Sequence, residues 1–276
     1  MLSPRHARLS FTTFVCACLL AAGTRGGVVR AQEAQAQTPA QSAETARGVA
    51  LYKQGDFKAA VDSLKKASRQ DAADADAWQY LALALKQTGD EKSAQRTMER
   101  AVYLRHARLS SFSVSNRPYS ALSKEERAVF RAEQARRYAA ALETVNAYLQ
   151  FEPQDAAFWR EQAESLNFYI AQAENPAQDD AIYAGDEVTA RAVILSKPLP
   201  TYTEEARQHQ ISGRILVRLV LAPDETVQHV LVTRPLPYGL SERALEVARR
   251  IRFKPAMKDG RAVAQYVTIE YGFSIY

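Results

Sequence analysis

The stretch Lys53-Gln54-Gly55-Asp56-Phe57 has a near copy in Lys86-Gln87-Thr88-Gly89-Asp90, and the two Gly-Asp pairs stand 34 residues apart. Small and apolar residues recur at the same offset: Ala60, Leu64 and Ala67 correspond to Ala94, Met98 and Ala101. Glycine adopts the left-handed conformation that ends a helix, and an aspartate directly after it can cap the next helix. The spacing therefore predicts two successive pairs of antiparallel helices.

This pattern resembles the tetratricopeptide repeat, whose stacked helix pairs form a solenoid with an inner face that binds peptides or other domains. We expect an all-α solenoid over residues 44–174, with a weaker third copy at 122–155, where Arg136-Arg137 replace the Gly-Asp turn. A capping helix is expected over 156–173 and an inserted loop at about 108–120. The residues predicted to line the groove are Thr45, Tyr52, Gln79, Leu83 and Lys86. The alternative is that they are only packing or solvated positions.

Residues 1–31 follow the pattern of a secretory signal peptide, and 32–43 are expected to form a flexible tail. The apolar run over 11–22 would be about 18 Å long as a helix, against a membrane core of about 30 Å. Cleavage near Ala31 would remove four arginines and no acid, which lowers the formal net charge from +5 to +1. We therefore expect a periplasmic protein without a nucleic-acid partner. The alternatives are an uncleaved inner-membrane anchor and, from Cys16 and Cys18, a lipidated N-terminus.

Beyond a predicted linker at 175–187, the apolar period changes from 3.6 residues to two. Alternation predicts strands over 214–221, 227–234 and 265–276, and short helices over 204–208 and 242–251. In the last strand one face carries Val267, Ile269, Tyr271, Phe273 and Ile275. The order predicts a small α+β domain over 188–276 with a three-stranded antiparallel sheet.

An ordered set of residues marks the same third of the chain: Pro200-x-Tyr202, Ala206, Gly213, the alternating strand, Phe253-Lys254-Pro255-Ala256 and Asp259-Gly260. This set resembles the C-terminal domain of the TonB family. The resemblance implies that the last strand lies at a sheet edge and binds an extended segment of an outer-membrane transporter. Strand addition suits the unpaired N–H and C=O groups of such an edge. The residues expected to make the contact, mainly through their backbone, are Gln265, Tyr266, Val267, Thr268, Ile269 and Glu270.

The motifs favour a binding protein over an enzyme. His106, His209 and His229 lack the spacing of paired metal ligands, and the sequence holds no phosphate loop, nucleophile elbow or dinucleotide fingerprint. We expect no catalytic residue, metal or cofactor. The prediction is a periplasmic adaptor that supports energy-coupled transport by binding an outer-membrane transporter. The alternative is an envelope-assembly or cell-wall scaffold that uses the repeat groove without transporter contact. An exposed edge strand also makes a homodimer plausible.

Overall fold

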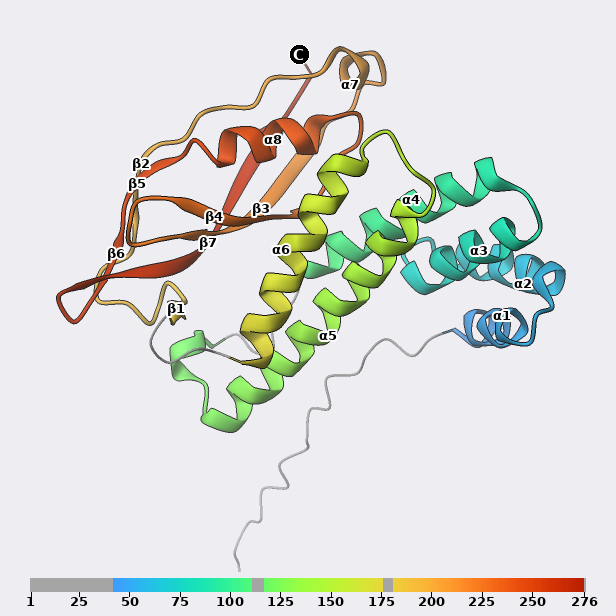
Figure 1. Cartoon of the computed structure of the whole chain (residues 1–276), viewed down its shortest axis with the longest axis horizontal. Helices are drawn as coiled ribbons and strands as arrows, with labels where there is room; N and C mark the ends of the chain where they lie inside the picture. Colours follow the sequence, from blue (N-terminus) through green and yellow to red (C-terminus); the bar gives the residue numbers. More distant parts are fainter. Residues whose placement is uncertain (1–41, 111–116, 176–180, 276) are drawn as a thin grey trace, which may run out of the picture. The chain divides into compact units, whose positions relative to one another are not determined.

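The computed structural model describes residues 42–110, 117–175 and 181–275 (Figure 1). The predicted signal peptide, nearly all of the predicted tail and the centre of the predicted insert lie outside these ranges. Within them the chain begins with helices: α1 (Ala43–Lys53), α2 (Phe57–Gln70), α3 (Ala75–Gln87), α4 (Glu91–Leu109), α5 (Lys124–Leu149) and α6 (Ala156–Glu174), with a short 3-10 turn at Tyr119–Ala121. In these ranges no helix has both the length and the apolar character needed to cross a membrane.

The first two helix pairs form at the predicted turns. Gly55 and Gly89 adopt φ values of 84° and 86°, the left-handed conformation that ends a helix. The side chains of Asp56 and Asp90 then accept hydrogen bonds from the first turns of α2 and α4, over 3.1 and 3.2 Å. The caps proposed from the repeat spacing are therefore confirmed.

The third helix pair differs from the prediction. Helix α5 runs without a break through Arg136 and Arg137, so residues 122–155 are not a helix pair. The cause is local: both arginines pair with Glu133 on the same helix, and no glycine or proline interrupts the run. The third pair consists instead of α5 and α6, which pack against each other. The expected insert also begins later, because α4 continues to Leu109.

The C-terminal part is α+β, as predicted, but its main sheet has five strands instead of three. The path is β1-β7-β3-β4, and β6 pairs with one end of β7. Strands β3, β4 and β7 form the expected antiparallel core, whereas β1 is parallel to β7. The bounds are β1 (Ile182–Tyr183), β3 (Gly213–Leu221), β4 (Val227–Arg234), β6 (Ala256–Lys258) and β7 (Arg261–Phe273). The alternating apolar residues of β3, which are Ile215, Val217, Leu219 and Leu221, are all fully buried.

The remaining elements flank this sheet. A two-stranded sheet joins β2 (Val193–Ser196) to β5 (Arg252–Lys254), and helices α7 (Glu204–Gln208) and α8 (Leu240–Ala248) lie near the predicted positions. The predicted linker contributes β1 to the main sheet, and its Asp186 carboxylate accepts two hydrogen bonds from Ser120. This part of the chain is therefore fastened to the fold. The proposed domain boundaries themselves stay a prediction.

One hydrophobic core joins the helices to the sheet. It includes Tyr138 and Trp159 from α5 and α6 together with Val217 and Val232 from β3 and β4. Helices α4 and α6 both contact β4, as Figure 1 shows for α6 beside the sheet. The repeats and the sheet thus bury apolar surface against each other. Helix α6 forms where a separate capping helix was predicted, but it completes the third pair and also contacts the sheet.

Candidate functional site

Helix α6 closes the β4 edge of the sheet with side chains in place of a strand. The Gln162 amide oxygen accepts from the Val232 N–H over 2.7 Å, and its amide nitrogen donates to the Val230 carbonyl over 3.4 Å. Ser165 donates to that same carbonyl over 3.1 Å. An edge strand left open invites pairing with another chain, and covering it with a helix prevents this. Strand addition at this edge is blocked.

Two further side chains extend this closure. Tyr169 donates to the carbonyl of His229 over 3.0 Å. From α4, the Nδ1 atom of fully buried His106 lies 2.7 Å from the carbonyl oxygen of Val232. Burial lowers the pKa of His106 to about 4, so the ring is neutral and donates through Nδ1. Sequence reasoning treated the histidine as isolated. For the contacts made by α6, the sequence did hold a signal: the polar residues 162, 165 and 169 recur on one face of the helix.

The opposite edge, along β7, is open over most of its length. On one side β7 pairs with β3 from Gln265 to Phe273. On the other side β1 reaches only Ala264 and Gln265. Beyond Gln265, no strand of residues 42–110, 117–175 or 181–275 pairs with that side of β7. The unpaired edge therefore begins beyond the Tyr183–Gln265 pair, at the Tyr266 carbonyl.

Two contacts show which backbone groups of β7 face this open side. Thr233 of β4 donates to the Leu216 carbonyl over 3.3 Å, so the backbone of Leu216 faces β4. Its partner on β7, Glu270, therefore faces away from β3, and the Lys197 ammonium group reaches the Glu270 carbonyl over 3.3 Å. Backbone groups alternate in direction along a strand. The outward N–H and C=O groups thus belong to Tyr266, Thr268, Glu270 and Gly272.

The structure places the six predicted edge residues in different surroundings. Gln265 is buried and holds the Ala192 N–H through its side chain over 2.8 Å, which ties it to the fold. Val267 and Ile269 turn toward the core side of the sheet. Thr268 and Glu270 are exposed. The binding role of the six edge residues stays a prediction. The outward backbone groups confine the predicted contact to residues 266–272.

Exposed apolar side chains follow the same edge. The segment that starts at Ala192, beside Gln265, and passes Lys197, beside Glu270, runs alongside β7. Its side chains Val193, Leu195 and Leu199 are 55%, 54% and 77% exposed. Exposed apolar side chains that lie close together mark sites of protein contact. A strand added to β7 would find apolar cover beside it.

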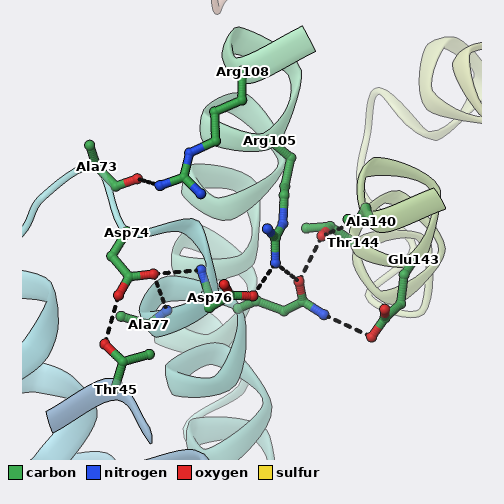
Figure 2. Close-up of polar contacts among 11 residues, drawn as sticks. Thr45, Ala73, Asp74, Asp76, Ala77, Arg105, Arg108, Ala140, Glu143 and Thr144 are labelled. Carbon is green, nitrogen blue, oxygen red and sulfur yellow. Dashed lines mark hydrogen bonds and ion pairs between the residues drawn. The ribbon is translucent and has the colours of Figure 1, made fainter. Parts of the chain in front are cut away.

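Two of the five predicted groove residues, Thr45 and Gln79, are buried inside the helical repeats. Figure 2 shows the contact of Thr45 with Asp74. Thr45 is fully buried and donates to Asp74 over 2.6 Å, while Asp74 caps α3. Gln79, only 3% exposed, accepts from Thr144 over 2.7 Å and donates to Glu143 over 3.1 Å. These side chains join α1, α3 and α5 to one another. Their polar groups are satisfied within the chain.

The other three predicted groove residues are partly accessible. Tyr52 packs against Phe57 and Tyr80 at ring distances of 5.5 and 5.6 Å. Leu83 packs partly against the core, and the Lys86 ammonium group lies 4.5 Å from the centre of the Phe151 ring. The predicted groove is thereby narrowed to Tyr52, Leu83 and Lys86, and its binding role stays a prediction.

Comparison with known proteins supports both resemblances. Residues 198–275 match the family model of the Gram-negative bacterial TonB protein C-terminal, and residues 48–89 match that of the TPR repeat. A similar solved structure, the "Solution NMR structure of Pseudomonas aeruginosa TonB CTD", is 25% identical, with a TM-score of 0.26. The match covers 30% of this chain and 86% of that one. No curated protein matches. The first match includes the whole open edge of β7.

Proposed function

We propose that this protein is an envelope adaptor that binds an extended segment of an outer-membrane transporter, which adds as a strand to the open edge of β7. The observation that carries the proposal is the asymmetry of the sheet. Side chains of α4 and α6 occupy the β4 edge, whereas no strand of the described residues pairs with the outward side of β7 from Tyr266 to Gly272. The match to the TonB C-terminal family supports the class of partner.

The size of this edge suits a reversible contact. The outward groups of Tyr266, Thr268, Glu270 and Gly272 can form about four to six backbone hydrogen bonds, each contributing about 1 kcal/mol net. Ordering the incoming segment and releasing Lys197 from Glu270 offset part of this gain. The expected dissociation constant is micromolar or weaker. Specificity would come from the exposed side chains of Thr268 and Glu270 and from the apolar segment around Leu195.

The helical repeats would hold a second partner, with Tyr52, Leu83 and Lys86 as contacts. Both matched families are typically binding modules, so we propose a binding role without catalysis. We further propose export to the periplasm with cleavage near Ala31. Intact mass and N-terminal analysis of cell fractions test this: a start at Gln32 in the soluble periplasm supports an adaptor. A retained Met1 in the inner membrane would contradict cleavage and favour an energy transducer.

The decisive experiment replaces one outward N–H. Thr268→Pro removes the N–H that faces the open side while leaving the hydrogen bonds to β3 intact, because proline is tolerated on the free side of an edge strand. The matched control, Thr268→Ala, changes the same side chain but keeps the N–H. Val267→Pro is a poorer test, since its N–H faces β3 and its loss would disturb the sheet itself.

The full chain, labelled with ¹⁵N, is titrated with a peptide that carries the periplasmic N-terminal segment of an outer-membrane transporter. We expect amide shifts confined to residues 266–272, binding by Thr268→Ala, and at least tenfold weaker binding by Thr268→Pro. Equal binding by the two folded variants would contradict strand addition at this edge. Binding to sacculi or other envelope proteins but not to the peptide would favour the scaffold alternative. Peptide-independent dimerisation through the same amides would show that a second copy occupies the edge.

A further inference from the structure

A cavity of about 260 Å³ lies between helices α5 and α6 and the strands β1, β3 and β7. Aromatic rings dominate its walls, and two arginines, Arg131 and Arg218, reach it from different elements. The aromatic residues are Tyr119, Phe130, Tyr138, Tyr169 and Tyr266. Pockets of this kind, largely apolar with a few polar groups, are the usual form of small-molecule sites.

Arg218 of β3 brings a positive charge to this cavity without an acidic partner. Its guanidinium lies beside two neighbouring rings, 5.2 Å from the centre of Tyr169 and 4.9 Å from that of Tyr266, whose own centres are 6.0 Å apart. Across the described residues no carboxylate forms an ion pair with it, and its buried Nε has no hydrogen-bond acceptor. Cation–π contacts offset only part of the cost of burying a charge. The Tyr169 hydroxyl is a hydrogen-bond partner of the guanidinium, whereas its Nε–H has no acceptor among the described residues.

Glu187, the acidic residue that lines the cavity, already has an ion-pair partner and a hydrogen-bond donor. The Glu187 carboxylate lies 3.5 Å from Arg127 and accepts the Ala184 N–H over 2.9 Å. Arg131, in contrast, lies 3.4 Å from the neutral Tyr119 hydroxyl. A ligand in this cavity would therefore meet a net positive charge.

We infer that this cavity binds a small carboxylate attached to a flat apolar body, with the acid group on Arg218 and the body against the aromatic side chains that line the cavity. The planar guanidinium fork fits a carboxylate through two parallel hydrogen bonds. At about 30 Å³ per water-sized unit, the volume accommodates roughly nine non-hydrogen atoms, the size of a single aromatic acid. This inference does not require strand addition at β7, because it uses the side chains of Arg218, Tyr266 and the helices, whereas strand addition uses the outward backbone groups of β7.

Benzoate is the matching probe, and benzamide is its neutral control of the same shape. On the full chain, NMR titration is expected to shift the Arg218 Nε–H and the Tyr266 amide, with a benzoate dissociation constant of about 1–10 mM. Benzamide is expected to bind at least tenfold more weakly, because it loses the charge-assisted pair. Equal shifts with both probes, or none with benzoate, would overturn the inference. The tripeptide Gly-Gly-Phe, with a free or an amidated C-terminus, distinguishes a free acid from a peptide end as the source of the carboxylate.

Variants of Arg218 test whether this residue binds the carboxylate of benzoate. Arg218→Gln should abolish the benzoate shifts, and Arg218→Lys, which keeps the charge but loses the fork, should weaken binding several-fold. The matched control is Arg214→Gln, on the same strand and face but exposed and paired with Glu270. Undiminished benzoate binding by folded Arg218→Gln would contradict the proposal. If that variant does not fold, the benzoate-against-benzamide comparison on the unaltered protein decides alone.

Discussion

Protonation of His106 should loosen the closure of the β4 edge. The ring is fully buried and packs edge-on against Trp159, with 5.0 Å between ring centres. Its Nδ1–H donates to the Val232 carbonyl, while Nε2 is buried without a hydrogen-bond partner. A second proton must go to Nε2, where nothing among the described residues accepts it. The folded state therefore favours the neutral form of the His106 ring.

The magnitude follows from the pKa of the two states. Burial lowers the pKa of His106 from 6.5 to about 4 in the folded protein. Between these values the unfolded chain binds more protons, so stability is full above pH 6.5 and is lost as pH falls toward 4. The whole difference corresponds to about 3 kcal/mol, of which about 2 kcal/mol is lost between pH 7.5 and 5.0.

The assay is urea unfolding at pH 7.5 and 5.0, followed by tryptophan fluorescence and circular dichroism, on the unaltered protein and on His106→Gln. Glutamine can donate to the Val232 carbonyl but does not titrate. The unaltered protein should lose about 2 kcal/mol more than the variant between the two pH values. Other titrating groups, including His229, are common to both proteins and cancel. Identical pH dependence in the two proteins would refute the reasoning.

Two further substitutions test other contacts. Gln162→Leu leaves the Val232 N–H without its acceptor and should lower the free energy of unfolding by about 2 kcal/mol, measured in urea; Asn167→Leu, exposed on the same helix, should change it by less than about 0.5 kcal/mol. Gly89→Ala places a side chain at φ 86° and should lower the thermal midpoint through a cost of about 1 kcal/mol. Gly272→Ala, in open space on β7, is the neutral control, and an equal effect of both would contradict the argument.

The sequence could predict features that depend on near neighbours along the chain. Gly55-Asp56 and Gly89-Asp90 end one helix and cap the next, so the first two helix pairs followed from four residues. Strict alternation likewise predicted β3 and the buried side chains Ile269, Tyr271 and Phe273 of β7. It was wrong for Ile275, which lies beyond the end of β7 and is 40% exposed. These signals are local because backbone conformation and side-chain direction repeat with a fixed period.

The tertiary structure decided which backbone edge and which polar side chains remain available for binding. That Tyr266 to Gly272 form an open edge depends on where β1 stops, and the closure of β4 depends on Gln162 and His106, far from β4 in the chain. Alternation in β3 shows only that Arg218 lies on the face opposite Val217 and Leu219, whereas packing against α6 placed it beside Tyr169 and Tyr266. Which polar group meets which partner is fixed by the docking of helices onto the sheet. The period of the sequence sets only the face on which each group lies.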